Sequence, residues 1–217
     1  MEQVELARND LDRLRAEYVA REERLAGSDI YSPFNPANLF MVQQRQRAEL
    51  ALLAKHGLSR LEGKRILEVG CGRGGVLQNY LGYGARHETL HGTDLLLDRL
   101  QDAHTRLPQL SLACTDGLRL PYVDNSFDLI LQYTVFSSIL DGSLKATLAS
   151  EMMRLLRKPG GLIVWYDFWF NPTNKQTRGI RPPEIRQLFP GCGFEFRRIT
   201  LAPPVARGVV PLSRRSD

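Results

Sequence analysis

Apolar residues recur every seven positions along the first part of the chain, as they do on one face of a helix. These positions are Val4, Leu11, Tyr18 and Leu25, with Ala7 and Leu14 beside them. The pattern predicts a helix over residues 2–26, whose apolar stripe must pack on a further element because an isolated helix is marginal in water. Gly27, Pro33 and Pro36 interrupt the pattern. A second helix is predicted over residues 37–56, and Gly57 is a plausible stop.

From Lys64 onward, apolar runs of strand length alternate with helical stretches. Strands are predicted over residues 65–70, 89–95, 110–115, 127–135 and 161–168, and helices over residues 75–81, 96–106 and 143–157. The last two predicted elements are a short helix over residues 182–189 and a strand over residues 194–201. Strands that are apolar on both faces suit a parallel sheet covered on each side. The alternation predicts an α/β, doubly wound, mostly parallel Rossmann-like sheet flanked by helices, with an N-terminal helical extension.

Composition places the chain among ordinary globular proteins. It has 217 residues, of which 43% are hydrophobic and 24% charged, enough for one substantial core. No apolar run approaches the ~20 residues of a membrane span, and the charged N-terminus does not resemble a secretion signal. The three cysteines, Cys71, Cys114 and Cys192, are odd in number and scattered. They indicate a reducing, cytoplasmic location and give no metal-ligand spacing, so no metal is expected.

Positive charge is concentrated toward the C-terminus. Residues 150–217 hold 12 Lys and Arg against 5 Asp and Glu, whereas residues 1–149 hold 17 against 19. Such a basic segment could attract an anionic substrate or a nucleic acid. A solvated surface is the favoured interpretation because aromatic residues are not interleaved with the arginines, as they are in RNA-binding patterns. Nucleic acid is therefore an unlikely partner.

The stretch "ILEVGCGRGG" at residues 66–75 matches two nucleotide-loop patterns at once. Gly70, Gly72 and Gly75 satisfy the G-x-G-x-x-G spacing of a dinucleotide fold. Glu68, followed by glycines at positions 70, 72 and 74, satisfies a different loop, E-x-G-x-G-x-G. The loop follows a buried strand and precedes a helix, which is where doubly wound sheets bind their ligands.

Three carboxylates around the loop help to distinguish the two patterns. Glu68 at the mouth would repel a pyrophosphate and suits a ligand with a positive or hydrogen-donating group. Asp94, at the end of the second strand, can accept both hydroxyls of a ribose, a feature that both ligand classes share. Asp116 ends the next strand and can accept the exocyclic amine of adenine, with the Gly117 amide beside it. Glu68 and Asp116 argue against a nicotinamide dinucleotide.

Four segments together resemble the class I S-adenosylmethionine-dependent methyltransferases, and within them the type 11 methyltransferase domain. They are "ILEVGCGRGG", "GTDL", "CTDGLRLPYVDNSFDLIL" and "LLRKPGG", spread over residues 62–168. The resemblance implies S-adenosyl-L-methionine as cofactor, residues 61–217 as the methyltransferase domain and residues 1–60 as an N-terminal helical cap or lid. It implies cofactor contacts at Glu68, Gly70, Cys71, Gly72, Gly74, Asp94, Leu95, Asp116, Gly117 and Gln132.

The acceptor side of the site is less well determined. Many relatives carry histidines after the fourth strand, but here "QYTVFSSIL" has Ser137 and Ser138, so no histidine base can be carried over. Asp167 and Tyr133, at strand ends, are the candidate catalytic residues. The candidate substrate contacts are Tyr31, Phe34, Trp169 and Arg178. The aromatic residues among them are equally explained by core or lid packing.

The expected function is transfer of a methyl group to an oxygen or nitrogen atom of a small-molecule acceptor, such as a metabolite, a natural product or a sugar-like compound. Three alternatives stay open: a nucleic-acid methyltransferase, a cofactor-binding protein without catalysis, and a nicotinamide-dependent oxidoreductase. After residues 194–201, two adjacent prolines and a polar end fit a final strand poorly. A bare sheet edge, or the N-terminal helix, could therefore support a homodimer.

Overall fold

The computed structural model describes residues 2–171, 174–200, 205–208 and 210. These residues form two compact units. The first combines residues 2–19 with residues 60–194, and the second combines residues 20–59 with the described residues from 195 onward. The predicted division into a cap of residues 1–60 and a domain of residues 61–217 stays a prediction.

The first unit is built on one sheet of five parallel strands in the order β3-β2-β1-β4-β5. The strands are β1 (Ile66–Val69), β2 (Leu90–Asp94), β3 (Ser111–Cys114), β4 (Leu129–Tyr133) and β5 (Leu162–Tyr166). Each lies inside a range predicted from the sequence. The α/β doubly wound fold is therefore confirmed, since helices lie in three of the four crossovers between consecutive parallel strands.

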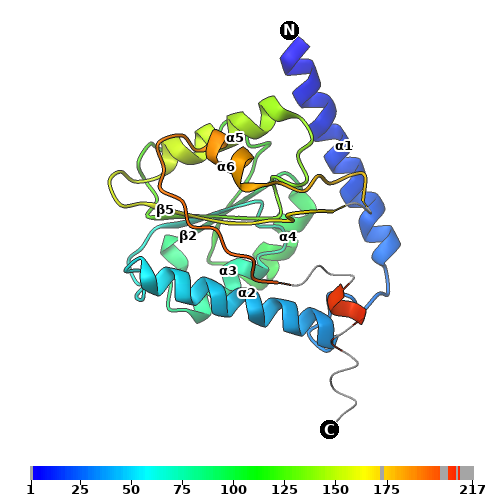
Figure 1. Ribbon diagram of the computed structural model, residues 1–217, viewed down its shortest axis with the longest axis horizontal. Helices are drawn as coiled ribbons and strands as arrows, with labels where there is room; N and C mark the ends of the chain where they lie inside the picture. Colours follow the sequence, from blue (N-terminus) through cyan, green and yellow to red (C-terminus); the bar gives the residue numbers. More distant parts are fainter. Residues whose placement is uncertain (1, 172–173, 201–204, 209, 211–217) are drawn as a thin grey trace. The chain divides into compact units, whose positions relative to one another are not determined.

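The helices of the first unit cover both faces of this sheet. They are α3 (Gly75–Gly82), α4 (Leu97–Arg106), α5 (Gly142–Leu155) and α6 (Pro182–Leu188), with a short 3₁₀ helix, η1 (His87–Thr89), before β2. Figure 1 shows α5 and α6 above the sheet and α3 and α4 below it. Covered from both sides, the central strands β1 and β4 are buried at every position.

Burial of these strands follows from their sequence. β1 and β4 consist largely of Ile, Leu and Val, and their neighbours Tyr80, Phe127 and Phe136 are fully buried around them. Burying one large apolar side chain contributes about 1.5–3 kcal/mol. The two polar side chains within β1 and β4, Glu68 and Gln132, are buried as well. Their burial is costly without a function or a partner, which directs attention to the end of the sheet where they lie.

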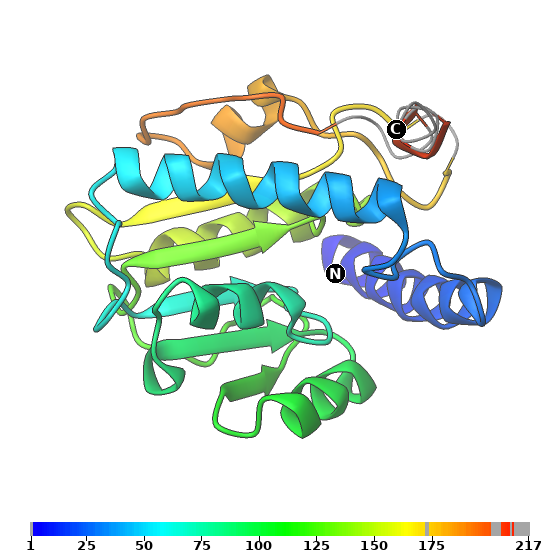
Figure 2. The same ribbon diagram turned by 90° about the horizontal axis from the view of Figure 1, so that it is seen from below.

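The first helix, α1 (Glu2–Leu25), confirms the helix predicted at the N-terminus. Within the first unit its apolar stripe is buried at Ala7, Leu11 and Leu14. Asp10 lies on the same part of the helix, and its Oδ2 accepts hydrogen bonds from the backbone amides of Leu140 and Asp141, both at 2.9 Å. In Figure 2 the strand arrows point toward this first part of α1.

The second unit is organised by α2 (Pro36–Lys55), which confirms the second predicted helix. Asn35 caps its N-terminus by accepting hydrogen bonds from two backbone amides with its side chain. Ala206 and Val210 pack on Ala37 of this helix, together with Phe40 and Met41. At the other end of α2, Lys55 Nζ lies 2.7 Å from Glu195 Oε2. Residues far apart in the sequence are thus attached to both ends of one helix.

The strand predicted over residues 194–201 is wrong for residues 194–200, which form no strand; residue 201 lies outside the described residues. The alternation in "FEFRRI" resembles that of a strand, but a strand also needs a partner for its backbone. Glu195 is held instead by ion pairs with Lys55 and Arg197. Side-chain pairing to α2 thus takes the place of backbone pairing to the sheet.

None of the described helices combines the length with the apolar character that crossing a membrane requires. The cytoplasmic location expected from the cysteines stays a prediction.

Asp128 links the start of β4 to its surroundings. Its Oδ2 accepts the backbone N–H of Arg65 at 2.9 Å, and its Oδ1 accepts from Arg157 Nη1 at 2.6 Å. We expect Asp128→Ala to lower the free energy of unfolding by about 1–3 kcal/mol, because it leaves a backbone donor unpaired and removes a partly buried ion pair. Urea unfolding measures this change.

Asp102→Ala is the matched control, since Asp102 also pairs with an arginine, at 2.6 Å, but its side chain is 49% exposed against 13% for Asp128. It should change the free energy of unfolding much less than Asp128→Ala does, because solvent screens an exposed ion pair. Equal effects of the two substitutions would contradict a special role for Asp128.

Candidate active site

The strand order of the sheet reverses between β1 and β4, two of its inner strands. Successive crossovers leave this point toward opposite edges of the sheet, so the loops that follow β1 and β4 diverge and leave room for a ligand. The loop after β1 is residues 70–74, and the loop after β4 is residues 134–141. The candidate site is therefore assembled from the carboxyl ends of the strands.

The glycine loop after β1 depends on backbone conformations that favour glycine. Gly70, Gly72 and Gly74 have φ values of 73°, 51° and 77°. At Gly70 a Cβ would lie only 2.3 Å from Val135 Cγ2, so the loop after β4 packs against the bare backbone here. At Gly72 a Cβ would meet nothing within 4 Å. The backbone around Gly72 therefore borders open space, as a loop that receives a ligand must.

Asp94, at the end of β2, closes this loop. Its Oδ2 accepts the backbone N–H of Gly72 at 2.7 Å, and its Oδ1 accepts that of Leu96 at 2.9 Å. Burial raises the pKa of its carboxyl, while these hydrogen bonds act in the opposite direction. Each oxygen keeps further acceptor capacity. Asp94 is thus both a brace for the loop and a group that can receive hydroxyl donors.

Glu68 and Cys71 flank the loop in the interior. Both are buried, and burial raises the pKa of the Cys71 thiol, with the negative charges of Glu68 and Asp94 adding to the effect. The thiol therefore stays protonated and unreactive. The same electrostatics mark the surroundings of the loop as negative, which suits a cationic ligand. Leu95 is half-buried, and its carbonyl accepts a weak hydrogen bond from the Cys114 thiol at 3.7 Å.

Asp116 and Gly117 lie in the turn after β3. The Asp116 carboxylate is exposed, and its Oδ1 accepts the backbone N–H of Leu118 at 3.0 Å. Gly117 is buried with a φ of 80°, and a Cβ there would lie 3.0 Å from Leu148 Cδ1. The backbone of Thr115 is joined to the end of β2, since its N–H donates to the Asp94 carbonyl at 3.0 Å.

Gln132 and Asp167 meet at the ends of β4 and β5. Gln132 Nε2 donates to Asp167 Oδ2 at 3.3 Å, and the backbone N–H of Ser137 donates to the same oxygen at 3.2 Å. Burial raises the pKa of the Asp167 carboxyl, against the effect of these hydrogen bonds. Gln132 is wholly buried, and its Oε1 has no hydrogen-bond partner among the described residues. A buried acceptor of this kind calls for a donor from outside the chain.

Tyr133, the other candidate catalytic residue, points to the opposite face of the sheet from Gln132 because side chains alternate along a strand. Its ring is buried, with its centroid 5.9 Å from that of Tyr166. The structure therefore brings Asp167 and Gln132 together and leaves Tyr133 apart from them. The catalytic role of Tyr133 stays a prediction.

The four candidate substrate contacts divide between the two units. Trp169 and Arg178 belong to the first unit; Trp169 is exposed, and Arg178 Nη2 lies 2.9 Å from Glu184 Oε1. Tyr31 and Phe34 belong to the second unit, where Tyr31 contacts Arg21 and Phe34 is 93% exposed. Their common role in binding an acceptor stays a prediction.

Several residues of α1 contact the loop after β4, which sequence reasoning did not foresee. Arg13 Nη2 donates to the Ser138 carbonyl at 2.6 Å, and the Tyr18 hydroxyl lies 3.5 Å from Ser138 Oγ. The guanidinium of Arg99, in α4, stacks over the Tyr18 ring at 4.2 Å. Asp10 and Arg13 stand three residues apart on one helix face, but nothing in the sequence says which loop that face meets.

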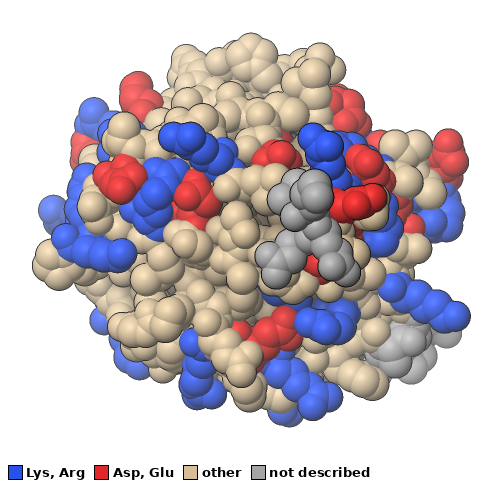
Figure 3. All heavy atoms as spheres, turned by 90° about the horizontal axis from the view of Figure 1, so that it is seen from above, with Lys and Arg blue, Asp and Glu red and all other residues tan. Residues whose placement is uncertain are grey.

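The basic C-terminal segment forms several ion pairs. Four of its arginines pair with acidic side chains: Arg154, Arg157, Arg178 and Arg197. On the face seen in Figure 3, basic and acidic side chains are interspersed. The charge excess of the sequence therefore does not form one uniform basic patch on that face. Among the described residues, no cluster of three or more His, Cys, Asp or Glu side chains could hold a metal ion.

Comparison with known families agrees with this geometry. Residues 66–161, which run from β1 to the residue before β5, match the family model described as a methyltransferase domain. The chain carries a class I S-adenosylmethionine-dependent methyltransferase domain. The predicted class I family is thus confirmed, whereas the narrower assignment to the type 11 domain stays a prediction.

Curated relatives of the methyltransferase domain are named for the molecules that they methylate. A fatty-acid O-methyltransferase of Mycolicibacterium smegmatis is 38% identical over 49% of this chain and 38% of its own length. A phthiotriol/phenolphthiotriol dimycocerosates methyltransferase of Mycobacterium ulcerans is 34% identical over 53% of this chain and 41% of its own. The chain therefore spans about two fifths of the length of these relatives.

Solved structures agree on the fold of the methyltransferase domain. The PH0226 protein of Pyrococcus horikoshii superposes with a TM-score of 0.51 at 20% identity, over 65% of this chain and 63% of its own. The [4+2]-cyclase SpnF superposes with a TM-score of 0.51 at 19% identity, over 66% of this chain and 55% of its own. At such identities the likeness concerns the fold alone, and one of the two proteins is named for a different reaction.

The free energy of unfolding should depend on pH through the Asp167 carboxyl. Because burial raises the pKa of this carboxyl, the folded chain holds the proton to a higher pH than the unfolded chain, which releases it near pH 4. Stability from this group therefore falls as the pH rises from about 4 to the raised pKa. We expect the unfolding free energy of Asp167→Asn minus that of the wild type to increase from pH 4.5 to 7.5, measured by urea unfolding.

Asp102→Asn serves as the control for this titration. A hydrogen bond from Arg73 lowers the pKa of Asp102, so its stability contribution changes only below about pH 4. The unfolding free energy of Asp102→Asn minus that of the wild type should stay constant over the same pH range. A flat or falling difference for Asp167→Asn would show that burial does not govern the Asp167 carboxyl.

Proposed function

We propose that this chain transfers a methyl group from S-adenosyl-L-methionine to an oxygen or nitrogen atom of an apolar small-molecule acceptor. The observation that carries the proposal is the juxtaposition, at the strand ends, of the glycine loop braced by Asp94 and the hydrogen-bonded pair of Gln132 and Asp167. The first arrangement suits the cofactor, and the second suits the chemistry of the acceptor.

The residues present fit the cofactor. Open space borders Gly72, and the carboxylates of the buried Glu68 and the half-buried Asp94 favour a ligand with positive charge over a pyrophosphate. Asp94 keeps acceptor capacity for ribose hydroxyls, and the exposed Asp116 carboxylate can receive an amine. Gln132 Oε1 is a buried acceptor that lacks a donor among the described residues. Gly70, Cys71, Gly74, Leu95 and Gly117 complete the proposed contact set.

Catalysis would rest on positioning and on one proton acceptor. The bound cofactor supplies a methyl group already activated on a sulfonium, so a near-attack geometry provides much of the acceleration. The half-buried Asp167 accepts hydrogen bonds from Gln132 Nε2 and the Ser137 amide, and its raised pKa makes it a stronger base than an exposed aspartate. We assign Asp167 the role of taking the acceptor's proton, and Gln132 the role of orienting that carboxylate.

The acceptor is proposed to be apolar for two reasons. The relatives named for their substrates act on a fatty acid, on phthiotriol lipids and on sterols. In this chain, Trp169 and Phe170 follow Asp167 and Phe168 after the end of β5, and they are 41% and 64% exposed. Large exposed aromatic side chains beside a site are typical of surfaces that receive apolar ligands.

Removal of the Asp94 carboxylate tests the cofactor part of the proposal. We expect Asp94→Ala to weaken the binding of S-adenosylhomocysteine at least tenfold, because it deletes a hydroxyl acceptor and leaves the Gly72 amide without its brace. Isothermal titration calorimetry measures the dissociation constant. Asp98→Ala, an exposed residue four positions further along, should leave it unchanged. Unchanged affinity in Asp94→Ala would show that the ribose is placed wrongly.

Transfer to an acceptor tests the reaction itself. With cofactor labelled in its methyl group, we expect product from a panel that contains a long-chain fatty acid, a sterol, a phenol and a sugar, with the apolar members preferred. With the panel member that is methylated, Asp167→Asn should lower kcat by about 100-fold or more, since proton transfer contributes that much. Binding of S-adenosylhomocysteine without transfer to any member would favour a cofactor-binding protein without catalysis.

A further inference from the structure

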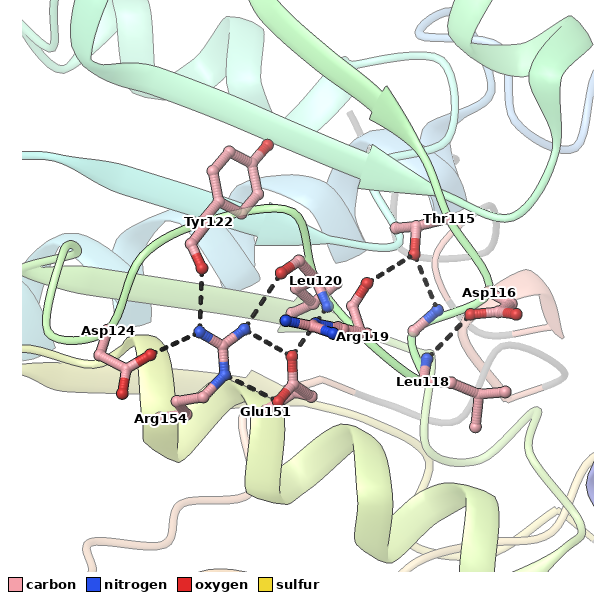
Figure 4. Close-up of polar contacts among 10 residues, drawn as sticks. Thr115, Asp116, Leu118, Arg119, Leu120, Tyr122, Asp124, Glu151 and Arg154 are labelled. Carbon is pink, nitrogen blue, oxygen red and sulfur yellow. Dashed lines mark hydrogen bonds and ion pairs between the residues drawn. The ribbon is translucent and has the colours of Figure 1, made fainter. Parts of the chain in front are cut away.

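Arg154, in the last turn of α5, uses every donor of its guanidinium. Nη1 donates to the Tyr122 carbonyl at 2.9 Å and to Asp124 Oδ1 at 2.7 Å, and Nη2 donates to the Leu120 carbonyl at 3.0 Å. Nη2 and Nε also donate to the two carboxylate oxygens of Glu151, at 2.6 and 2.8 Å. Figure 4 shows this fork, which reaches from the helix to the loop between β3 and β4. Five directed hydrogen bonds from one side chain fix its position closely.

Glu151, one turn earlier on α5, completes the contact. Its Oε2 accepts the backbone N–H of Leu120 at 2.8 Å in addition to the bond from Arg154. Hydrogen bonding from Arg154 lowers the pKa of this carboxyl, so it stays ionised at neutral pH. Both backbone polar groups of Leu120 are therefore held by one helix face, the amide by Glu151 and the carbonyl by Arg154.

The same helix supports the loop at two further points. The backbone N–H of Asn125 donates to the Arg154 carbonyl at 3.0 Å. Leu148, one turn before Glu151, touches the bare backbone of Gly117 so closely that a Cβ there would lie 3.0 Å from its side chain. Residues 115–125 contain no helix or strand of their own. Their conformation is therefore set from outside, by α5.

The turn that carries Asp116 is continuous with the part held by Arg154. Gly117 N–H donates to Thr115 Oγ1, and Thr115 Oγ1 donates to the Arg119 carbonyl, both at 3.3 Å. Leu118 N–H donates to the Asp116 carboxylate. The turn is thus anchored at one end by Leu120 and at the other by the bond from Thr115 N–H to the Asp94 carbonyl.

We propose that Arg154, together with Glu151, is a positioning residue that sets the purine selectivity of the cofactor site. By fixing residues 115–120, it holds the Asp116 carboxylate where it can accept the exocyclic amine of adenine. The inference rests on the proposed function and extends it, since neither residue touches the cofactor. A purine with a carbonyl at that position offers no amine donor and should be discriminated against.

Two probes test the inference: S-adenosylhomocysteine and S-inosylhomocysteine, in which a carbonyl replaces the amine and the adjacent ring nitrogen N1 carries a hydrogen. In calorimetry the wild type should bind the adenine compound about tenfold more tightly, as expected for one hydrogen bond to a charged group. In Arg154→Met this ratio should fall toward one, chiefly by loss of affinity for the adenine compound. Amide hydrogen exchange over residues 116–122 should be faster in the ligand-free variant.

Arg157→Met is the matched control, because Arg157 also pairs with an aspartate. Its partner is Asp128, at the start of β4, and not a residue of the turn that carries Asp116. It should keep the wild-type ratio. If Arg154→Met does not fold, Arg154→Lys carries the test, since it retains the charge and loses the fork.

The outcomes separate the two proposals. A wild type that binds neither compound overturns the proposed function and the inference with it. A wild type that binds both equally, or a folded Arg154 variant that keeps the tenfold ratio or weakens both compounds alike, overturns the inference and leaves the proposed function standing.

Discussion

The hydrogen bonds that Asp94 makes to two backbone amides hold the candidate site together. One amide belongs to Gly72, in the loop after β1, and the other to Leu96, just before α4. Because the carboxylate spans two crossovers of the sheet, the glycine loop can keep φ values that few other residues adopt. The Asp94 carboxylate braces this loop from within the protein, and open space borders it at Gly72. A parallel sheet makes this possible by bringing all its strand ends to one edge.

Helices of the first unit complete the site from outside the sheet. α5 fixes the turn of Asp116 through Arg154, and α1 fixes the loop after β4 through Asp10 and Arg13. In both cases charged side chains bind backbone groups of a loop that has no regular structure. Such loops carry the residues that contact ligands, while the helices give them their precision. Because the loops can change while the fold stays the same, one fold can carry different reactions. This agrees with the likeness of the fold to that of a [4+2]-cyclase.

Pattern reasoning succeeded where a residue's role depends on its own neighbours in the chain. Buried runs such as "LILQY" predict β4 because only a parallel sheet covers both faces of a strand. It failed at residues 194–200, where "FEFRRI" alternates correctly but pairs through Glu195 with Lys55. Alternation describes which face of a segment is apolar; it does not supply a neighbouring strand. The interaction that replaced the strand involves residues 140 positions apart, beyond any local pattern.

The sequence by itself determined the sheet, the glycine loop and the carboxylates at strand ends, because period, glycine spacing and position after a strand are local properties. Tertiary structure alone decided that Asp167 accepts hydrogen bonds from Gln132 and the Ser137 amide, and that Arg154 holds the Asp116 turn. These contacts join segments about 30 residues apart or more, and their geometry follows from strand order and helix packing. Which distant residues become neighbours in space is determined only when the chain folds.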